Sequence, residues 1–427
     1  MLIRKTKLVL AVASAVCLGV PTSVFATNGY FAHGYGTKNK AMGGAGVALP
    51  QDSLATATNP AGMAFVGDRF DFGTEFFAPQ RAYVITGSSV PSFNQGQRSE
   101  NSFFVIPSMA VNFILPWQDT FGIAVYGNGG MNTEYSNAVF GAPFGGTGPT
   151  GVDLIQLFVP LTYAHKITPT ASVGVSIIPV YQQFKATGLQ PFGTFISSQP
   201  TKATNNGYAS SSGIGYKVGG QMDIPGGVTL GASYQAEINM SEFDEYAGLF
   251  AENGNFDIPS TYTLGAAWKV TPKLTLVLDY QRINYTDSRA VANSAQLPPP
   301  VISSTLGTED GPGFGWADID IYKLGIQYTT GSWTWRAGWN KGENPVEADP
   351  VNSNGEVMFN ILAPGVLEDH YTLGFTKTLS STVEINIGYL YAPKVTVTGT
   401  NPAIFGGGTT TIYLYENSVE MSLGVKF

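Results

Sequence analysis

The sequence predicts an all-β fold, a 14-stranded antiparallel transmembrane β-barrel with an N-terminal plug inside its lumen. Charged residues make up only 12% of the chain, against about 25% in an average soluble domain. Beyond residue 66, apolar and polar residues alternate in segments of about ten residues, the length of a tilted membrane strand. In that region no apolar run reaches the roughly 18 residues that a spanning helix needs. A chain with this pattern crosses a membrane with strands.

Residues 1–26 have the pattern of a cleaved export signal. Arg4, Lys5 and Lys7 precede an apolar run from Leu8 to Val20, and small residues follow at Val24 to Ala26, where a signal peptidase reads the chain. The apolar run is short for a spanning helix. We therefore expect export and removal of this segment, with an uncleaved membrane anchor as the alternative.

The mature chain is acidic and carries no thiol. Loss of the three basic signal residues takes the formal charge from −8 to −11, and the single cysteine, Cys17, lies inside the signal. An acidic chain without basic clusters is a poor nucleic-acid partner. The three histidines, His33, His165 and His370, are too scattered to suggest a metal site. We expect no nucleic acid, no metal, no cofactor and no enzyme activity, since no Ser–His or Asp–His pairing is apparent.

Residues 27–66 form the predicted plug. Fifteen of these forty residues are Gly or Ala, and only Lys38, Lys40 and Asp52 carry charge. Such a segment has too few large apolar side chains to build its own core. Its small residues allow close packing of the backbone against another structure. We expect it to fold inside the barrel that residues 67–427 build.

The barrel strands follow in order after the plug, and each shows apolar residues on one face. The segment 333–341, for example, alternates Trp333, Trp335 and Trp339 with Thr334 and Arg336. The fourteen segments are residues 69–78, 103–115, 120–128, 153–166, 171–184, 213–223, 228–236, 261–270, 274–285, 317–328, 333–341, 369–379, 383–392 and 413–427.

The connections between these segments alternate in length. Short turns follow the even-numbered strands, whereas long segments rich in Gly, Asn, Ser and Pro follow the odd-numbered ones. Outer-membrane barrels of bacteria have this alternation, with short periplasmic turns and long outer loops. The chain ends in Phe427 on an apolar face, which resembles the signal read by the outer-membrane assembly machinery. A soluble β-sandwich or propeller is the alternative, but it does not require so few charges on one face of every strand.

The residues of the plug and the strand count resemble the FadL family, which also includes the TodX-type hydrocarbon channels. The most specific stretches are Ala41 to Gly46, which reads AMGGAG, and Asn59 to Met63, which reads NPAGM. The resemblance covers the whole chain. It implies an outer-membrane channel for hydrophobic compounds, chiefly long-chain fatty acids and, in some branches, aromatic hydrocarbons. It also implies that the plug is a hatch with a gate at Asn59, Pro60, Ala61 and Gly62, near an opening in the wall.

The same resemblance implies that an inward kink in the third strand opens the barrel wall. The third strand ends in Gly127, Asn128, Gly129 and Gly130. Glycines weaken ladder pairing and allow the conformations that bulges and bends require. From the residues alone, a simple strand end before an outer loop is the alternative.

The resemblance also implies that ligand is first captured on the outer loops after strands five and seven, which are residues 185–212 and 237–260 here. The second loop contains Phe243, Tyr246, Leu249 and Phe250, spaced like one face of a short helix. Apolar surface on an outer loop suggests a binding site. Packing of the loop on its neighbours is the alternative.

The face of the strands opposite the lipid is polar, as in an ordinary lumen. The inward-facing basic residues Lys217, Lys323 and Arg336 are candidate partners of a ligand carboxylate, which the resemblance implies for fatty acids. The remaining polar residues on this face are Gln221, Lys269, Asp279, Gln281, Gln327, Asn340, His370, Glu384, Asn386, Glu416 and Glu420.

The predicted function is passive uptake by a monomer. A hydrophobic molecule is captured on the outer loops, enters the lumen and leaves sideways into the outer membrane, because it would lose about 0.8 kcal/mol per CH₂ in a watery path. Outer-membrane lipid and lipopolysaccharide are the expected surroundings. A structural or adhesive barrel without transport and a porin for polar solutes are the alternatives.

Overall fold

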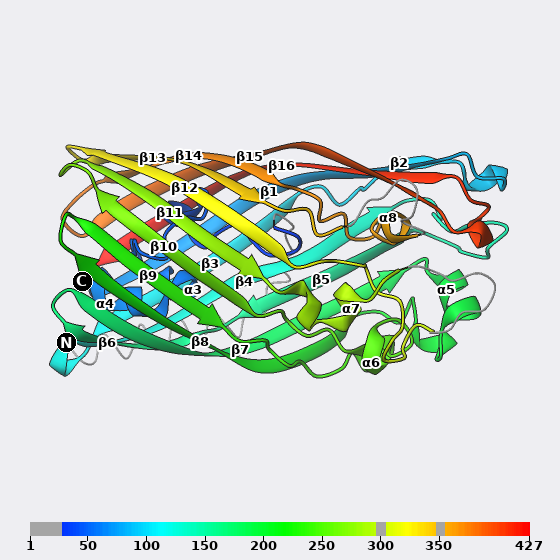
Figure 1. Ribbon diagram of the computed structural model, residues 1–427, viewed down its shortest axis with the longest axis horizontal. Coiled ribbons are helices and arrows are strands. Elements are labelled where there is room, and N and C mark those ends of the chain that lie inside the picture. Colours follow the sequence, from blue (N-terminus) through cyan, green and yellow to red (C-terminus); the bar gives the residue numbers. More distant parts are fainter. Residues whose placement is uncertain (1–27, 296–304, 347–354) are drawn as a thin grey trace.

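The computed structural model describes residues 28–295, 305–346 and 355–427, which form one closed antiparallel β-barrel (Figure 1). The predicted export segment, residues 1–26, lies outside these residues. The barrel closes because β1 pairs along its whole length with β16. Within the described ranges, no helix is long and apolar enough to span a membrane.

Sixteen strands carry the sheet, and each pairs with the next along the chain apart from the exceptions below. They are β1 (Arg69–Thr86), β2 (Gly96–Arg98), β3 (Phe104–Ile114), β4 (Asp119–Tyr135), β5 (Thr150–Phe158), β6 (Leu161–Thr168), β7 (Ala171–Thr187), β8 (Ala209–Ile224), β9 (Val228–Gln235), β10 (Thr261–Lys269), β11 (Leu274–Ile283), β12 (Ile319–Thr330), β13 (Trp333–Gly342), β14 (Asp369–Thr378), β15 (Val383–Thr400) and β16 (Thr409–Lys426).

These strands occupy fourteen positions in the barrel, which confirms the predicted fold class. Strands β5 and β6 share one position, because both pair with β4 on one side and β7 on the other. The sequence predicted one continuous strand over 153–166, but Pro160 interrupts it, since proline has no N–H to give to the ladder. The short β2 only extends the edge of β1.

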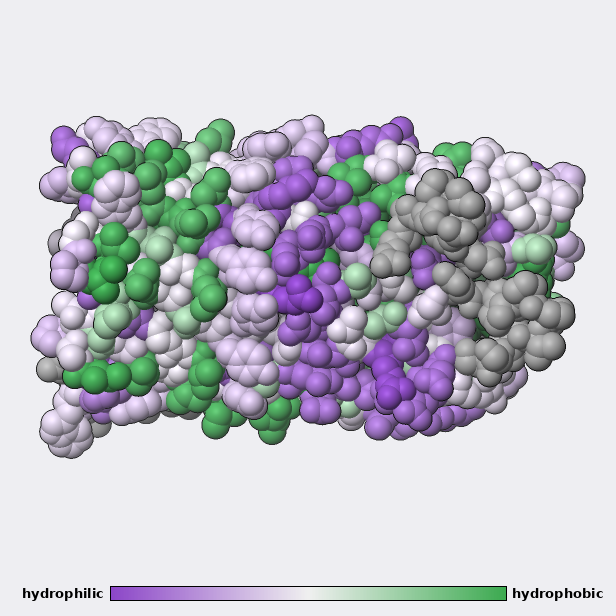
Figure 2. Space-filling model, viewed as in Figure 1, coloured by the Kyte–Doolittle hydropathy of each residue, from purple (hydrophilic) through white to green (hydrophobic). Residues whose placement is uncertain are grey.

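Side chains alternate between the lipid-facing and lumen-facing sides, as the sequence predicted. On β13, Trp335 is 49% exposed whereas Arg336 is 7% exposed. Hydrophobic residues gather over the half of the barrel nearer the short turns, and the other half of the visible face is more hydrophilic (Figure 2). A belt of this kind is the outer surface of a membrane barrel.

The two ends of the barrel differ. Short turns, such as residues 225–227 and 331–332, lie at one end together with the C-terminus, and we call this the turn end (Figure 1). The long connections lie at the other, the loop end. These carry α5 (Gln190–Ile196), α6 (Ala251–Gly254), α7 (Arg289–Ala292) and α8 (Glu356–Phe359). At the turn end the ring of Phe427 lies 5.9 Å from the ring of Phe113. The backbone N–H of Phe427 donates to the Asp68 carbonyl at 3.2 Å.

Residues 28–66, here called the N-terminal segment, lie among the inward-facing residues of the strands. The segment contains only short helical turns, namely α2 (Thr37–Lys40), α3 (Ala55–Thr58), the 3₁₀ turn Pro60–Gly62 and α4 (Met63–Val66). Most of its residues are buried and none is exposed, although it has few large apolar residues of its own. The segment is therefore ordered by the wall around it.

Glycines of the wall provide the space for this contact. At Gly338 an added Cβ would lie 2.0 Å from the Met42 carbonyl carbon, and at Gly174 it would lie 2.5 Å from that of Pro60. Only a residue without a side chain allows two backbones to approach so closely. We call these glycines the glycine belt. At each of them an added Cβ would lie within 3.0 Å of a backbone or side-chain atom of the N-terminal segment; they are Gly122, Gly129, Gly174, Gly219, Gly231, Gly265, Gly325, Gly338 and Gly374.

A buried ion network also ties the N-terminal segment to the wall near the turn end. The ammonium group of Lys38 binds the Glu384 carboxylate of β15, which also accepts from Arg69 at 2.6 Å. Arg69 in turn pairs with Asp71 at 2.6 Å. In the same region Lys40 pairs with Glu75. Each buried charge in this network has an opposite charge beside it, as burial requires.

Candidate functional site

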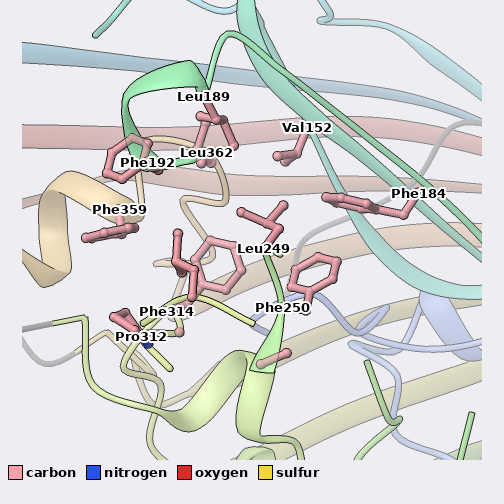
Figure 3. Close-up of a pocket in the computed structure, with 13 residues that line it drawn as sticks. Val152, Phe184, Leu189, Phe192, Leu249, Phe250, Pro312, Phe314, Phe359 and Leu362 are labelled. Atoms are coloured by element: carbon pink, nitrogen blue, oxygen red, sulfur yellow. The ribbon is translucent and has the colours of Figure 1, made fainter. Parts of the chain in front are cut away.

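An apolar pocket lies at the loop end, and we call it the outer pocket (Figure 3). Its empty space, including the part open to solvent, is ≈470 Å³. Such a pocket suits a molecule without polar groups. All residues that line it are apolar or glycine, namely Val152, Phe184, Leu189, Phe192, Leu249, Phe250, Ala290, Leu306, Pro312, Gly313, Phe314, Phe359 and Leu362.

The four predicted loop residues meet around Phe184, but they do not form one helix face. Leu249 and Phe250 line the pocket, whereas Phe243 and Tyr246 are buried behind it. The Phe184 ring lies 4.6 Å from that of Phe250 and 4.8 Å from that of Tyr246. Only 244–246 and 251–254 form helical turns in this loop.

Half of the pocket comes from loops that the sequence analysis did not consider. Leu306, Pro312 and Phe314 belong to the connection between β11 and β12, while Phe359 and Leu362 belong to the next long connection. In Figure 3 Pro312, Phe314, Phe359 and Leu362 lie around the same space as Leu249 and Phe250. The available signal was the presence of isolated large apolar residues in otherwise polar loops.

Aromatic rings continue from the outer pocket toward the N-terminal segment. The Phe250 ring lies 5.0 Å from that of Phe256, which lies 5.9 Å from that of Tyr30. Tyr30 also contacts Tyr285 at 5.3 Å and Trp316 at 6.0 Å between ring centroids. We call this row of rings the aromatic path. It leads from the loop end to Tyr30 of the N-terminal segment.

A second, polar pocket lies in the lumen between the N-terminal segment and β8 to β12. It contains two of the three predicted basic residues, Lys217 and Lys323, together with Asp279. Lys217 donates to the Ala57 carbonyl, and Lys323 donates to the His33 carbonyl at 3.0 Å. One Asp279 oxygen accepts the backbone N–H of Gly46 at 2.7 Å. Both lysines thus contact the N-terminal segment while they face this pocket.

Arg336 lies apart from this pocket. Its guanidinium group donates to the Gln51 side chain at 2.7 Å and to Thr376 at 2.7 Å, so it holds the N-terminal segment against β13 and β14.

His33 of the N-terminal segment is buried, and its ring stacks on that of His370 at 6.0 Å between ring centroids. Burial, and then the nearby Lys40 charge, lower the pKa of His33 well below its usual range.

The predicted gate residues Asn59 to Gly62 lie against β7 and β8. Asn59 donates its side-chain amide to the Gly220 carbonyl at 3.1 Å, and Ser172 donates to the Ala61 carbonyl at 2.8 Å. The sequence analysis expected them near the opening of the wall. In the structure it is Tyr30 to Ala32 that lie at the third barrel strand, because Phe31 pairs with Gly129 and Ala32 donates its N–H to the Asn128 carbonyl.

That strand, β4, leaves its neighbour β3 after Val125. The β3–β4 ladder ends at the pair Met109–Val125, and in the described structure residues 104–108 of β3 have ladder partners on β1 only. Farther on, β4 pairs with β5, with a register shift between Gly127 and Gly129. The Gly127 to Gly130 stretch therefore forms an irregular, bent part of the wall.

The bent part of β4 turns toward the lumen and contacts the N-terminal segment. Gly130 donates its N–H to the Tyr30 carbonyl at 2.9 Å, and Ala32 donates to the Asn128 carbonyl at 3.0 Å. At Gly129 an added Cβ would lie 2.0 Å from the Tyr30 carbonyl oxygen, so only glycine fits there. The aromatic path thus ends directly at the bend.

Apolar side chains fill the place where β3 and β4 separate. Phe77, Phe104 and Ile106 form one buried cluster, and Ile155 of β5 packs against it. Because Ile155 belongs to the β4–β5 ladder, the cluster joins the two separated edges of the wall. We call it the wall seam. Unlike a ladder, it is held by nondirectional contacts, which can be exchanged for contacts with another apolar molecule.

Several solved structures resemble this chain over nearly its full length. The toluene transporter TodX of Pseudomonas putida is 18% identical with a TM-score of 0.67, covering 94% of this chain and 100% of that chain. The toluene transporter TbuX of Ralstonia pickettii is 18% identical with a TM-score of 0.62, covering 92% and 99%. A FadL homologue of Pseudomonas aeruginosa is 15% identical with a TM-score of 0.65, covering 93% and 100%. At these identities the likeness shows the fold.

Sequence comparison gives one short curated match and one long family match. The short match is 46% identical over 65 residues to an uncharacterized protein in a phosphoenolpyruvate carboxykinase gene 5′ region of Chlorobium limicola. It spans 15% of this chain and 31% of that protein. The family described as outer membrane protein transport protein (OMPP1/FadL/TodX) matches residues 15–411. The chain therefore belongs to the OMPP1/FadL/TodX family, the outer-membrane channels for hydrophobic compounds.

Proposed function

We propose that this channel takes up long-chain fatty acids passively, through capture in the outer pocket and release through the wall seam. The observation that carries the proposal is the aromatic path, which connects an apolar pocket at the loop end with the bend in β4. A hydrophobic molecule that follows these rings stays in apolar contact at each step. Lateral release then avoids transfer of its chain into water, at about 0.8 kcal/mol per CH₂.

The fatty-acid assignment depends on the polar lumen pocket. A carboxylate that enters it meets the ammonium groups of Lys217 and Lys323, each of which has three donors. Charge-assisted hydrogen bonds of this kind are stronger than those to neutral acceptors, such as the backbone carbonyls that both lysines contact now. A bound carboxylate would therefore draw both lysines away from the N-terminal segment and loosen it.

In this proposal the N-terminal segment is the hatch, and its residues Tyr30 to Ala32 lie at the bend in β4. Its gate residues Asn59, Pro60, Ala61 and Gly62 follow Ala57, whose carbonyl Lys217 holds. The surrounding partners are outer-membrane lipid and lipopolysaccharide, and the chain acts as a monomer. Recognition by the outer-membrane assembly machinery through Phe427 remains a prediction.

A second candidate is uptake of aromatic hydrocarbons. The apolar lining of the outer pocket favours it, since no charged side chain is among those residues. The structural neighbours TodX and TbuX are described as toluene transporters. In that case the molecule would use the same path and seam without the two lysines.

Uptake of labelled oleate and toluene into cells that lack their own channel separates these candidates. Lys217→Gln combined with Lys323→Gln should reduce oleate uptake at least tenfold and leave toluene uptake unchanged, with the exposed turn residue Lys273→Gln as the control. Equal oleate uptake in the double variant would reject the carboxylate role. No uptake of either compound by the unaltered chain would favour a barrel without transport.

The lateral route has its own test. Ile106→Cys and Ile155→Cys place two thiols in the wall seam of a chain whose single cysteine lies in residues 1–26. A cross-link between them should stop uptake, and its reduction should restore uptake. Undiminished uptake by the cross-linked protein would show that molecules leave by another route.

A further inference from the structure

Arg81 of β1 lies at the loop-side edge of the wall seam. Its side chain is buried, with 5% of its surface exposed, although it carries a full charge. The seam begins at the last β3–β4 ladder pair, Met109–Val125. At its other edge, the two sides of the wall meet again where Glu100 donates its N–H to the Glu134 carbonyl at 2.8 Å. Arg81 lies beside this second meeting point, because Ser99 donates its N–H to the Arg81 carbonyl at 2.9 Å.

The guanidinium group connects both sides of the seam. One arm donates to the carbonyl of Asn132 on the bent strand β4, and the other donates to the carbonyl of Asn101, in the segment that leads into β3. The same group lies over the Phe104 ring, 5.5 Å from its centroid. Strands β1 and β4 have β3 between them in the sheet order. A side chain of one strand therefore spans the gap to a strand that is not its neighbour.

We propose that Arg81 is a specificity-determining positioning residue, a brace that sets the length of the wall seam and so limits the width of the molecules that leave through it. This inference rests on the proposed lateral release. The planar guanidinium group has five donors in a rigid fork, and two arms here hold two carbonyls on opposite edges. Its cation–π contact also fixes Phe104, one of the rings that fill the seam.

Replacement of Arg81 should widen the seam without opening the rest of the wall. Methionine has a similar length but no donors, so the two carbonyls lose their link and Phe104 loses its cationic neighbour. Lysine keeps one charge and reaches one carbonyl at a time, so it should give an intermediate effect. The backbone link from Glu100 to Glu134 is present in both variants, so the barrel itself should still close.

The test compares uptake of molecules of increasing width, namely toluene, naphthalene and pyrene, in cells without their own channel. Arg81→Met should raise the ratio of pyrene to toluene uptake about tenfold, and Arg81→Lys about threefold. The control is Arg98→Met on β2, an exposed arginine of the same region. A merely structural role would lower all three uptakes together and leave the ratio unchanged. Ratios within twofold of the control in both Arg81 variants would overturn the proposal.

Folding and route are checked in the same strains. Heat-modifiable electrophoretic mobility reports the closed barrel, and if Arg81→Met fails to fold, Arg81→Lys decides the outcome by its ratio alone. The seam cross-link between Ile106→Cys and Ile155→Cys distinguishes the two levels of failure. Undiminished uptake after cross-linking would overturn the lateral route and the brace with it. Uptake that the cross-link stops, together with unchanged ratios, would overturn the brace only.

Discussion

The glycine belt predicts that one methyl group can displace the N-terminal segment. An alanine at Gly338 would place its Cβ 2.0 Å from the Met42 carbonyl carbon and 2.1 Å from the Gly43 nitrogen. Those backbone atoms must move by about 1.4 Å to reach the 3.4 Å at which ordinary contact begins. Movement of this size also breaks the bonds from Gly43 N–H to Thr372 at 2.8 Å and from Asn340 to the Gly43 carbonyl at 3.2 Å.

The expected cost follows from these contacts. Overpacking costs about 1–3 kcal/mol, and each lost hydrogen bond adds about 1 kcal/mol. The total of about 3–5 kcal/mol shifts the ratio of docked to undocked segment by a factor of a hundred or more, at 1.4 kcal/mol per tenfold change. The barrel should still form, since Gly338 keeps its backbone partner Gly325 on β12.

A thiol at Thr37 measures this shift. Thr37 is 2% exposed, and Thr37→Cys makes the side chain no larger. In that background Gly338→Ala should raise the rate of labelling by a polar maleimide about a hundredfold. Gly220→Ala is the matched control, because its Cβ would meet only the Ser172 carbonyl oxygen, at 4.0 Å. Equal labelling of the two folded variants would refute the reasoning.

Three further predictions concern the outer pocket, the ion network and pH. Phe314→Ser should raise the half-saturating concentration for uptake about tenfold or more, since burial of a Phe side chain contributes about 1.5–3 kcal/mol to binding. The control Phe195→Ser, at a residue that is 61% exposed, should leave this concentration unchanged. Glu384→Gln leaves Lys38 and Arg69 without the Glu384 carboxylate, so docking of the N-terminal segment should weaken by about 3–5 kcal/mol. Faster labelling in the Thr37→Cys background would report this loss, and unchanged labelling would contradict it. Burial lowers the pKa of His33, so the docked N-terminal segment should become less stable as the pH drops below about 6.5, the pKa of a free histidine. Labelling in the Thr37→Cys background should therefore rise at low pH, relative to labelling of an exposed reference cysteine. His33→Gln should reduce this pH dependence.

The sequence predicted the strands correctly where they cross the lipid belt, but not their extensions beyond it. Lipid selects for apolar residues on one face, so each strand crossing the belt shows alternation. Beyond the belt β15 continues to Thr400 and β16 begins at Thr409, through threonine-rich stretches that carry no such alternation. Their predicted ends were therefore too short. The break at Pro160 was also missed, although a proline in a central strand is a recognisable signal.

The candidate site was predicted only where its residues are close in sequence. The Gly127 to Gly130 stretch was identifiable because its glycines are local. Phe314 and Phe359 reach the outer pocket from separate loops, and nothing in either loop indicates the other. The placement of Asn59 beside β8 likewise depends on Gly219 and Gly220, which come far later in the chain.

The glycine belt also constrains the order in which the molecule assembles. The N-terminal segment is synthesised before any strand, and only residues 67 and 68 separate it from β1. A finished, closed wall has no space through which a segment so tightly matched to its interior backbone can enter. The segment must therefore be inside before β1 meets β16, and the chain wraps around its own beginning. Substitutions in the belt should accordingly appear first as delayed closure, visible as a slow appearance of the heat-resistant form during refolding.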